Sequence, residues 1–179
     1  MSFIQDSYAL AAETLKKKFA KRNMDAFYCA TKEEAKNRIL SMIPEGSSVT
    51  WGGTESMEEA GVCEAIRTGN YEFIDRKSAK TPEEARALYG KVVCADYFLT
   101  STNAFTTDGE LVNIDGASNR VACIAHGPAH VIVLASMDKM CASVEDAYNR
   151  VRTLACPPNA MRVGADTPCA KTGICGNCL

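Results

Sequence analysis

Apolar residues along this chain recur with two different periods, and segments with the two periods alternate. Spacings of three and four positions predict helices, whereas short apolar runs rich in β-branched and aromatic residues predict strands. The predicted helices cover residues 4–19, 31–43, 55–66, a segment that begins at residue 81, 121–125 and 143–154, and the predicted strands cover residues 26–29, 48–51, 71–75, 97–99 and 130–135. This alternation is typical of a Rossmann-like α/β fold, in which helices flank both faces of a mostly parallel central sheet.

The most informative stretch runs from Asp96 to Arg120. It begins as a predicted strand, turns polar at Ser101, and ends where a helix is predicted to begin. Buried polar groups need hydrogen-bond partners, so the polar block is either a well-bonded loop or the lining of a binding site, and its many donors and acceptors beside a strand end favour the site. The candidate ligand-binding residues in it are Ser101, Asn103, Asp108, Asn113, Asp115, Gly116, Asn119 and Arg120.

A second candidate segment, Gly52-Gly53-Thr54, follows the predicted strand 48–51 and precedes a predicted helix. The glycines would let a ligand approach the backbone, and the start of the helix would offer N–H groups to an anion. A tight turn with Thr54 as the N-cap explains the same residues equally well. Because ligands of open parallel sheets bind beyond the carboxyl ends of the strands, we predict that this segment and residues 101–108 lie on the same edge of the sheet.

Length and composition are those of an ordinary globular protein. The chain has 179 residues, 46% of them apolar and 23% charged, which fits a single domain. The net charge of −2 gives no reason to expect a nucleic acid or an anionic membrane surface as a partner. No apolar run approaches the roughly 20 residues that span a bilayer, and the N-terminal residues lack a signal-peptide pattern. A cytoplasmic location is therefore expected.

Nine cysteines are a high number for such a chain. Five lie singly among apolar residues and are expected to be small buried side chains: Cys29, Cys63, Cys94, Cys123 and Cys141. The other four are crowded near the C-terminus, where Pro157 and Pro158 predict that the preceding helix ends and that residues 156–179 form an irregular tail.

The spacing of Cys169, Cys175 and Cys178 fits ligands of one zinc ion or iron–sulfur cluster. Three thiolates are one fewer than a closed site normally has, and Cys156 would complete the set. The alternative is that these cysteines are buried or redox-active thiols. We expect the three sulfurs to converge, and we expect any metal bound by three thiolates to be labile.

Three segments, in chain order, carry a resemblance to a known family: SVTWGGTESMEEAGV, ADYFLTSTNAFTTDGELVNIDGASNRVACIAHGPAHVIVLAS and TPCAKTGICGNC. They resemble the LUD-domain family, the lactate-utilisation protein C-like group that was long a domain of unknown function. The resemblance extends from about the first predicted helix to the end of the chain, so we expect one LUD-type domain over residues 1–179. Family members generally lack a cysteine where Cys156 stands and continue with a further Ser-Pro-x-x-x-Cys segment, which implies that a fourth metal ligand is missing here.

The resemblance also implies a fold and a function. The fold is that shared by ribose-5-phosphate isomerase, glucosamine-6-phosphate deaminase and coenzyme A transferases. The function is connected with L-lactate oxidation, in which family members work beside iron–sulfur subunits. A weaker similarity links the central stretch to sugar-phosphate isomerases of the methylthioribose-phosphate type, whose catalytic acid would fall on Asn103. Because an amide cannot exchange a proton near neutral pH, the same isomerisation is not expected.

Two hypotheses for function follow. The first is an accessory or regulatory subunit of cytosolic lactate oxidation that binds a small anionic metabolite or a partner protein. Arg120 is its best candidate for a two-point clamp on a carboxylate or phosphate, although a salt bridge to a neighbouring acid would also explain that residue. The alternative is a stand-alone enzyme that acts on a sugar phosphate or a coenzyme A thioester. The sequence favours the first hypothesis, because no acid, base or nucleophile has a convincing partner.

Overall fold

Two compact units make up the chain in the computed structural model, which describes residues 3–176 and 178. Unit 1 consists of Met1–Phe27, Thr102–Ile114 and Met137–Leu179, and unit 2 consists of Tyr28–Ser101 and Asp115–Ser136. The chain therefore leaves unit 2 directly after Ser101 and returns to it at Asp115. The polar block of the central stretch is divided between the two units at these points.

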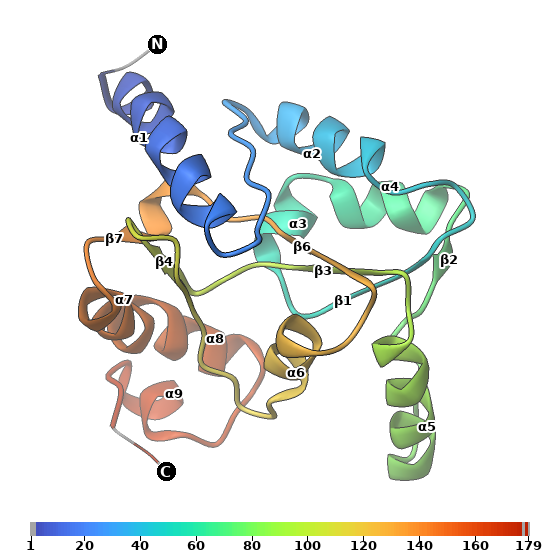
Figure 1. The fold of residues 1–179 in the computed structure, drawn as a ribbon. Helices are drawn as coiled ribbons and strands as arrows, with labels where there is room; N and C mark the ends of the chain where they lie inside the picture. The colour runs from blue at the N-terminus through green and yellow to red at the C-terminus, as the bar shows by residue number, and fades with distance from the viewer. Residues whose placement is uncertain (1–2, 177, 179) are drawn as a thin grey trace. The chain divides into compact units, whose positions relative to one another are not determined.

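Unit 2 is built on a parallel sheet with the strand order β2-β1-β3-β6 (Figure 1). In this sheet Tyr97 of the central strand β3 lies opposite Val49 of β1 on one side and His130 of β6 on the other. The elements of unit 2 are α2 (Lys32–Ser41), β1 (Ser48–Trp51), α3 (Glu55–Glu59), α4 (Val62–Thr68), β2 (Glu72–Phe73), α5 (Pro82–Val93), β3 (Tyr97–Thr100), α6 (Asn119–Ala125) and β6 (His130–Val133). The predicted α/β class with a mostly parallel sheet is confirmed.

Adjacent residues of β3 supply the cores on the two faces of this sheet. Successive side chains of a strand point to opposite faces, and Phe98 and Leu99 are both fully buried. Leu99 packs into a core formed with α2, α3 and α4, whereas Phe98 packs against Val92 of α5 and Cys123 of α6. Helices therefore cover both faces of the sheet in unit 2, as Figure 1 shows for the strands β1 and β3.

Side-chain caps fix the predicted starts of two helices in unit 2. Thr31 accepts a hydrogen bond from the N–H of Glu34 at the start of α2. At the start of α5, Thr81 and Glu84 form a complete capping box, with Pro82 in the first turn. These caps satisfy N–H groups that have no partner within the helix, which is why the sequence located both helix starts correctly.

Unit 1 contains a small second sheet with the strand order β5-β4-β7. The ring of Phe105 in β4 lies 6.2 Å from that of Phe19 in α1, whereas the neighbouring Ala104 packs against Ala147 and Val151. The small sheet thus packs against α1 on one face and α7 on the other. The elements of unit 1 are α1 (Phe3–Ala20), β4 (Ala104–Thr106), β5 (Leu111–Val112), the 3₁₀ turn η1 (Met137–Lys139), β7 (Met140–Cys141), α7 (Val144–Arg150), the π-helical segment η2 (Val151–Ala155), α8 (Cys156–Arg162) and α9 (Pro168–Thr172).

Three predicted strand features differ from the structure. Residues 26–29 are not a strand, and β4 and β7 were not predicted. The segment 130–135 was expected to be a buried strand, but β6 pairs only with β3 and lies half-exposed at the edge of its sheet. A short apolar run predicts a strand, but it does not show whether the strand lies in the centre or at the edge of its sheet.

The prediction of an irregular tail over residues 156–179 is wrong for α8 and α9. Pro157 lies in the first turn of α8, where a missing N–H costs nothing. In the preceding π-helical segment the N–H of Cys156 bonds to the carbonyl of Val151, five residues back. Pro168 opens α9 in the same way.

Within the described part of the chain, none of the helices has the length and apolar character that crossing a bilayer requires.

Asp96 joins the starts of β1 and β3, and this contact makes stability depend on pH. Its Oδ2 accepts hydrogen bonds from the N–H and the hydroxyl of Ser48, at 2.8 and 2.7 Å. These hydrogen bonds hold the pKa of Asp96 below its usual value of 3.8. A lowered pKa contributes stability that is present above pH 3.8 and is lost as the pH falls through the folded-state pKa.

Asp96→Asn should therefore lower the melting temperature at pH 7, and its difference from wild type should shrink once the pH falls below 3.8. Thermal unfolding followed by circular dichroism from pH 7 to the acid limb measures this difference. Asp25→Asn, at an exposed position of the chain, is the control. A difference that stays constant over the whole pH range would show that Asp96 acts through packing and not through its charge.

Candidate functional site

The carboxyl edge of the unit 2 sheet brings together residues from both candidate segments. The strands β1 and β3 are parallel neighbours, and the N–H of Gly52 donates to the carbonyl of Leu99 at 3.2 Å. Gly52 and Ser101 therefore leave the sheet at the same edge. The predicted shared edge holds for Ser101, whereas residues 102–108 of the second segment belong to unit 1.

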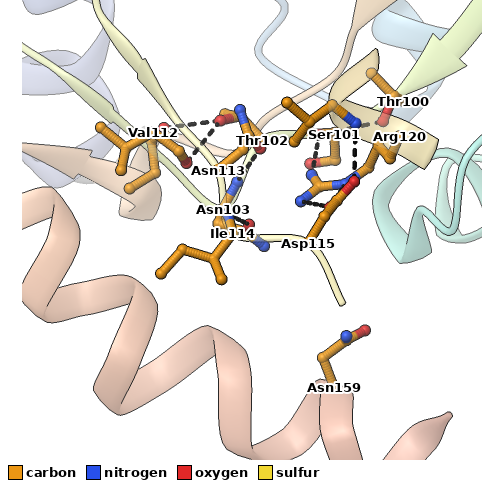
Figure 2. Close-up of polar contacts among 12 residues, drawn as sticks. Thr100, Ser101, Thr102, Asn103, Val112, Asn113, Ile114, Asp115, Arg120 and Asn159 are labelled. Carbon is orange, nitrogen blue, oxygen red and sulfur yellow. Dashed lines mark hydrogen bonds and ion pairs between the residues drawn. The ribbon is translucent and has the colours of Figure 1, made fainter. Parts of the chain in front are cut away.

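Arg120 is the central side chain of this edge (Figure 2). Its Nε and Nη2 lie 2.8 and 2.7 Å from Oδ1 of Asp115, and its Nη1 donates to the carbonyl of Ser101 at 3.0 Å. The side chains of Arg120 and Asp115 are only 11% and 9% exposed. Of the two interpretations of Arg120, the salt bridge to a neighbouring acid is thus realised, in a place where solvent screens it little.

Asp115 also fixes the start of α6. Its second oxygen, Oδ2, accepts a hydrogen bond from the N–H of Val121 at 2.8 Å. Ser118, just before the helix, has a left-handed backbone with φ of 58° and makes no side-chain cap. Asp115 takes over the capping of the first turn, so one carboxylate orients both Arg120 and the helix that carries it. Gly116 lies exposed in this turn, and Asn119 is half-buried at the first helical position.

Gly52 is required by packing. A Cβ at this position would lie 2.9 Å from Cζ of Phe98 and 3.1 Å from Cγ of Arg120. The glycine therefore makes room for the stem of Arg120, which differs from the expected close approach of a ligand. Gly53 is exposed, and the buried Thr54 caps α3 by accepting a hydrogen bond from the N–H of Met57 at 3.4 Å. Of the two explanations of Gly52-Gly53-Thr54, these contacts agree with the tight turn in which Thr54 is the N-cap.

Buried hydroxyl groups surround the same edge. Ser101 is 7% exposed, and its Oγ lies 3.5 Å from Oγ of Ser56 in the first turn of α3. Thr100 is fully buried and donates to the carbonyl of Ser101. Sequence reasoning missed Ser56, although its place two residues after a capping threonine, just beyond a strand end, was the available signal.

Asn103 and Asn113, both in unit 1, hold a loop together by reciprocal hydrogen bonds (Figure 2). The N–H of Asn103 donates to Oδ1 of Asn113 at 3.2 Å, and the N–H of Ile114 donates to Oδ1 of Asn103 at 3.1 Å. Arg150 adds a hydrogen bond from its Nη1 to the carbonyl of Asn103 at 2.7 Å. The structure thus gives these two amides a structural role that their residue types alone did not indicate.

Asp108, also in unit 1, pairs with α1. Its Oδ1 accepts a hydrogen bond from Nζ of Lys18 at 2.7 Å, and its side chain is 62% exposed. The contact with Lys18 lowers the pKa of Asp108 from its usual value. Arg22 reaches the same turn through the carbonyl of Asp108 and the carboxylate of Glu110. Asp108 therefore fastens the β4–β5 turn to α1.

Two hollows in the described part of the chain are lined by residues other than those of the carboxyl edge. One is lined by Lys18, Lys21, Arg22, Asp108 and Glu110, and the other by Ser78, Ala79, Lys80, Glu84 and Leu88. In the first hollow the ion pairs of Asp108 and Glu110 already neutralise two of the three cations. Neither hollow is lined by Arg120, Asp115 or Ser101 of the carboxyl edge.

The cysteines differ in exposure and surroundings. Cys63 and Cys123 are fully buried, as expected, and burial raises the pKa of Cys63 to about 12. Cys29 and Cys141 are half-buried, whereas Cys94 is exposed, which corrects its expected burial.

The metal site expected at Cys169, Cys175 and Cys178 is not preassembled. Within the described residues, no three histidine, cysteine, aspartate or glutamate side chains are placed so that they could hold a metal ion. The expected convergence of the three sulfurs is therefore not seen, and binding of zinc or an iron–sulfur cluster there stays a prediction.

The geometry defines an α/β protein with a buried arginine–aspartate pair at the carboxyl edge of a parallel sheet. A family model described as LUD domain matches residues 12–177, and the chain therefore belongs to the LUD domain family. Family membership connects the protein, in general terms, with lactate utilisation. A search of curated proteins and a search of solved structures each found no match.

Gly52→Ala should destabilise unit 2, because the added methyl group meets Phe98 and Arg120 in a packed core. Overpacking of this kind costs about 1–3 kcal/mol, and denaturant unfolding measures the cost. Gly90→Ala is the matched control, because Gly90 is a helical residue of α5 whose added Cβ would have nothing within 4 Å. That control should be stabilised by about 0.5–1 kcal/mol. An unchanged stability of Gly52→Ala would mean that the Arg120 stem moves freely.

Removal of one partner of the Arg120–Asp115 pair should cost more than removal of both. Asp115→Ala leaves a buried guanidinium without its counter-charge and should lose about 3–5 kcal/mol of unfolding free energy. The double variant Asp115→Ala/Arg120→Met leaves no uncompensated charge and should lose less than Asp115→Ala alone. Chemical denaturation of the single and double variants measures this coupling, and additive losses would contradict it.

Proposed function

We propose that this LUD domain protein is an accessory or regulatory subunit of cytosolic L-lactate oxidation, and that it binds a small anionic metabolite at the carboxyl edge of the unit 2 sheet. The observation that carries the proposal is the largely buried guanidinium of Arg120, held in one orientation by Asp115 and by the carbonyl of Ser101. Family membership supports the connection with lactate utilisation.

The chemistry of this edge suits a small hydroxy acid or keto acid. A guanidinium recognises a carboxylate through its N–H groups, and a carboxylate ligand would share Arg120 with Asp115, which already bonds Nε and Nη2. The hydroxyls of Ser56 and Ser101 can donate to or accept from a second oxygen of the ligand. Asp115 balances the charge of Arg120, so recognition would depend on directed hydrogen bonds more than on net charge. Weak salt dependence of binding is the expected consequence.

The hydrogen bonds that Asp115 already makes at this edge favour a binding role over catalysis. Asp115 already accepts hydrogen bonds from Arg120 and from the N–H of Val121. Both oxygens of this carboxylate are thus engaged in holding Arg120 and the start of α6, and use as a general base would compete with these contacts. The partner in the proposed role is an iron–sulfur subunit of the lactate oxidation system, as the family resemblance implies.

Titration calorimetry of the intact protein with L-lactate and with pyruvate tests the proposal. Ser101→Ala should weaken binding by about 0.5–1.5 kcal/mol, the net value of one hydrogen bond. Arg120→Lys keeps the charge but removes the fork and should weaken binding by about 1.5–3 kcal/mol. Ser41→Ala and Arg86→Lys, at exposed positions of α2 and α5, should leave the affinity unchanged.

Two outcomes would contradict the proposal. Equal affinity of Ser101→Ala, Arg120→Lys and wild type would place the ligand elsewhere. Steady turnover of a sugar phosphate or a coenzyme A thioester by the purified protein would replace the accessory role with the enzymatic alternative.

A further inference from the structure

Four of the nine cysteines belong to the last part of unit 1, where α8 and α9 pack together (Figure 1). Cys156 is the first residue of α8, and Cys169 lies in α9. Cys175 and Cys178 follow α9. All four are thiols in this structure. From the sequence alone, these cysteines could be either metal ligands or buried or redox-active thiols.

One contact brings Cys175 next to the start of α8. The Nε of Arg152 donates a hydrogen bond to Sγ of Cys175 at 3.5 Å. Arg152 lies four residues before Cys156 in a continuous helical segment, and residues at this separation are neighbours on a helix surface. Burial raises the pKa of Cys156, and the charge of Cys175 raises it further.

The segment that carries Cys175 is folded back onto α9. Gly173 ends that helix in a left-handed conformation with φ of 75°, and its N–H donates to the carbonyl of Cys169. Gly176 lies against Pro168, since a Cβ on Gly176 would be 2.8 Å from Cβ of that proline. Cys175 thus lies between the left-handed turn at Gly173 and the contact of Gly176 with Pro168. Cys175 is half-buried, whereas Cys178 is exposed.

We propose that Cys156 and Cys175 form a redox-active dithiol whose oxidant is a low-molecular-weight disulfide such as glutathione disulfide. This proposal is independent of ligand binding at the carboxyl edge of unit 2. It requires two neighbouring thiols and no metal ion.

The reaction is a pair of thiol–disulfide exchanges. The thiolate of Cys175, next to the guanidinium of Arg152, attacks one sulfur of the small disulfide and releases one small thiol. The thiolate of Cys156 then attacks the sulfur of Cys175, breaks the mixed disulfide and releases the second small thiol. The protein loses two protons and two electrons, and the small disulfide gains them.

The structural consequence is a covalent link between the first residue of α8 and the segment after α9. Cys156 packs against the Ala147 and Val151 core of unit 1, so the link would tie residues 157–174 to that core. Oxidation would add a covalent link to α9, which already packs against α8 in the thiol form.

Mass spectrometry of the full chain in glutathione redox buffers, with a chelator present, tests the proposal. After alkylation of the remaining thiols, oxidised wild type should retain one intramolecular disulfide, and peptide mapping should place it between Cys156 and Cys175. Cys156→Ser should stop at the intermediate, with one glutathione on Cys175. Cys175→Ser should form no disulfide at Cys156. Cys178→Ser and Cys94→Ser, at exposed positions, should be oxidised as wild type is.

Arg152 is expected to act as a positioning residue in the first exchange. Arg152→Ala should slow formation of the mixed disulfide several-fold, and Arg152→Lys should restore part of the rate, whereas the alkylation rate of Cys94 should stay the same in both variants.

Three results would overturn the proposal. The first is a disulfide mapped to another pair, such as Cys175 and Cys178. The second is wild type that accumulates only mixed disulfides. The third is stoichiometric zinc or iron that survives the chelator and protects the thiols, which would assign the cysteines to a metal site.

Discussion

The buried ion pair between Arg120 and Asp115 is the contact on which the carboxyl edge of unit 2 depends. A guanidinium that is 11% exposed loses most of its hydration, and this loss is offset only if hydrogen bonds replace the water. Two nitrogens of Arg120 bond to Asp115 and the third bonds to the carbonyl of Ser101. The pair thereby links the end of β3 to the start of α6 by directed bonds.

The same pair explains residues that at first indicate a ligand site. Gly52 is a glycine because the Arg120 stem and Phe98 occupy the space of a side chain. Asp115 is an acid because it must balance a cation and also cap α6. Ligand recognition at this edge would therefore use groups that the fold has already fixed, which is the condition for binding without a large ordering cost.

The sequence predicted those parts of the fold that depend on interactions between residues close together in the chain. Thr31 and the Thr81-Pro82-Glu84 pattern located helix starts, because a cap is made within three residues. The strand β4 could not be found in this way, since Phe105 pairs with Met140, far along the chain. The tail helices were missed because prolines were interpreted as helix breakers, whereas Pro157 and Pro168 stand in first turns.

For the candidate site, residue types indicated polar chemistry but could not show how each side chain is used. Arg120 and Asp115 were recognised as candidates, and the salt bridge was one of the two interpretations. Asn103 and Asn113 resembled ligand-binding amides, yet their side-chain oxygens accept backbone N–H groups. Only three-dimensional structure distinguishes an amide that awaits a ligand from one that holds a loop.

The most direct test of this account is a nuclear magnetic resonance titration of the labelled protein with L-lactate. The account predicts saturable shifts of the backbone amide signals of Gly53, Ser56, Ser101 and Arg120. Shifts confined to Lys18, Lys21 and Arg22, or no saturable shift at all, would contradict the claim that the carboxyl edge of unit 2 binds the ligand.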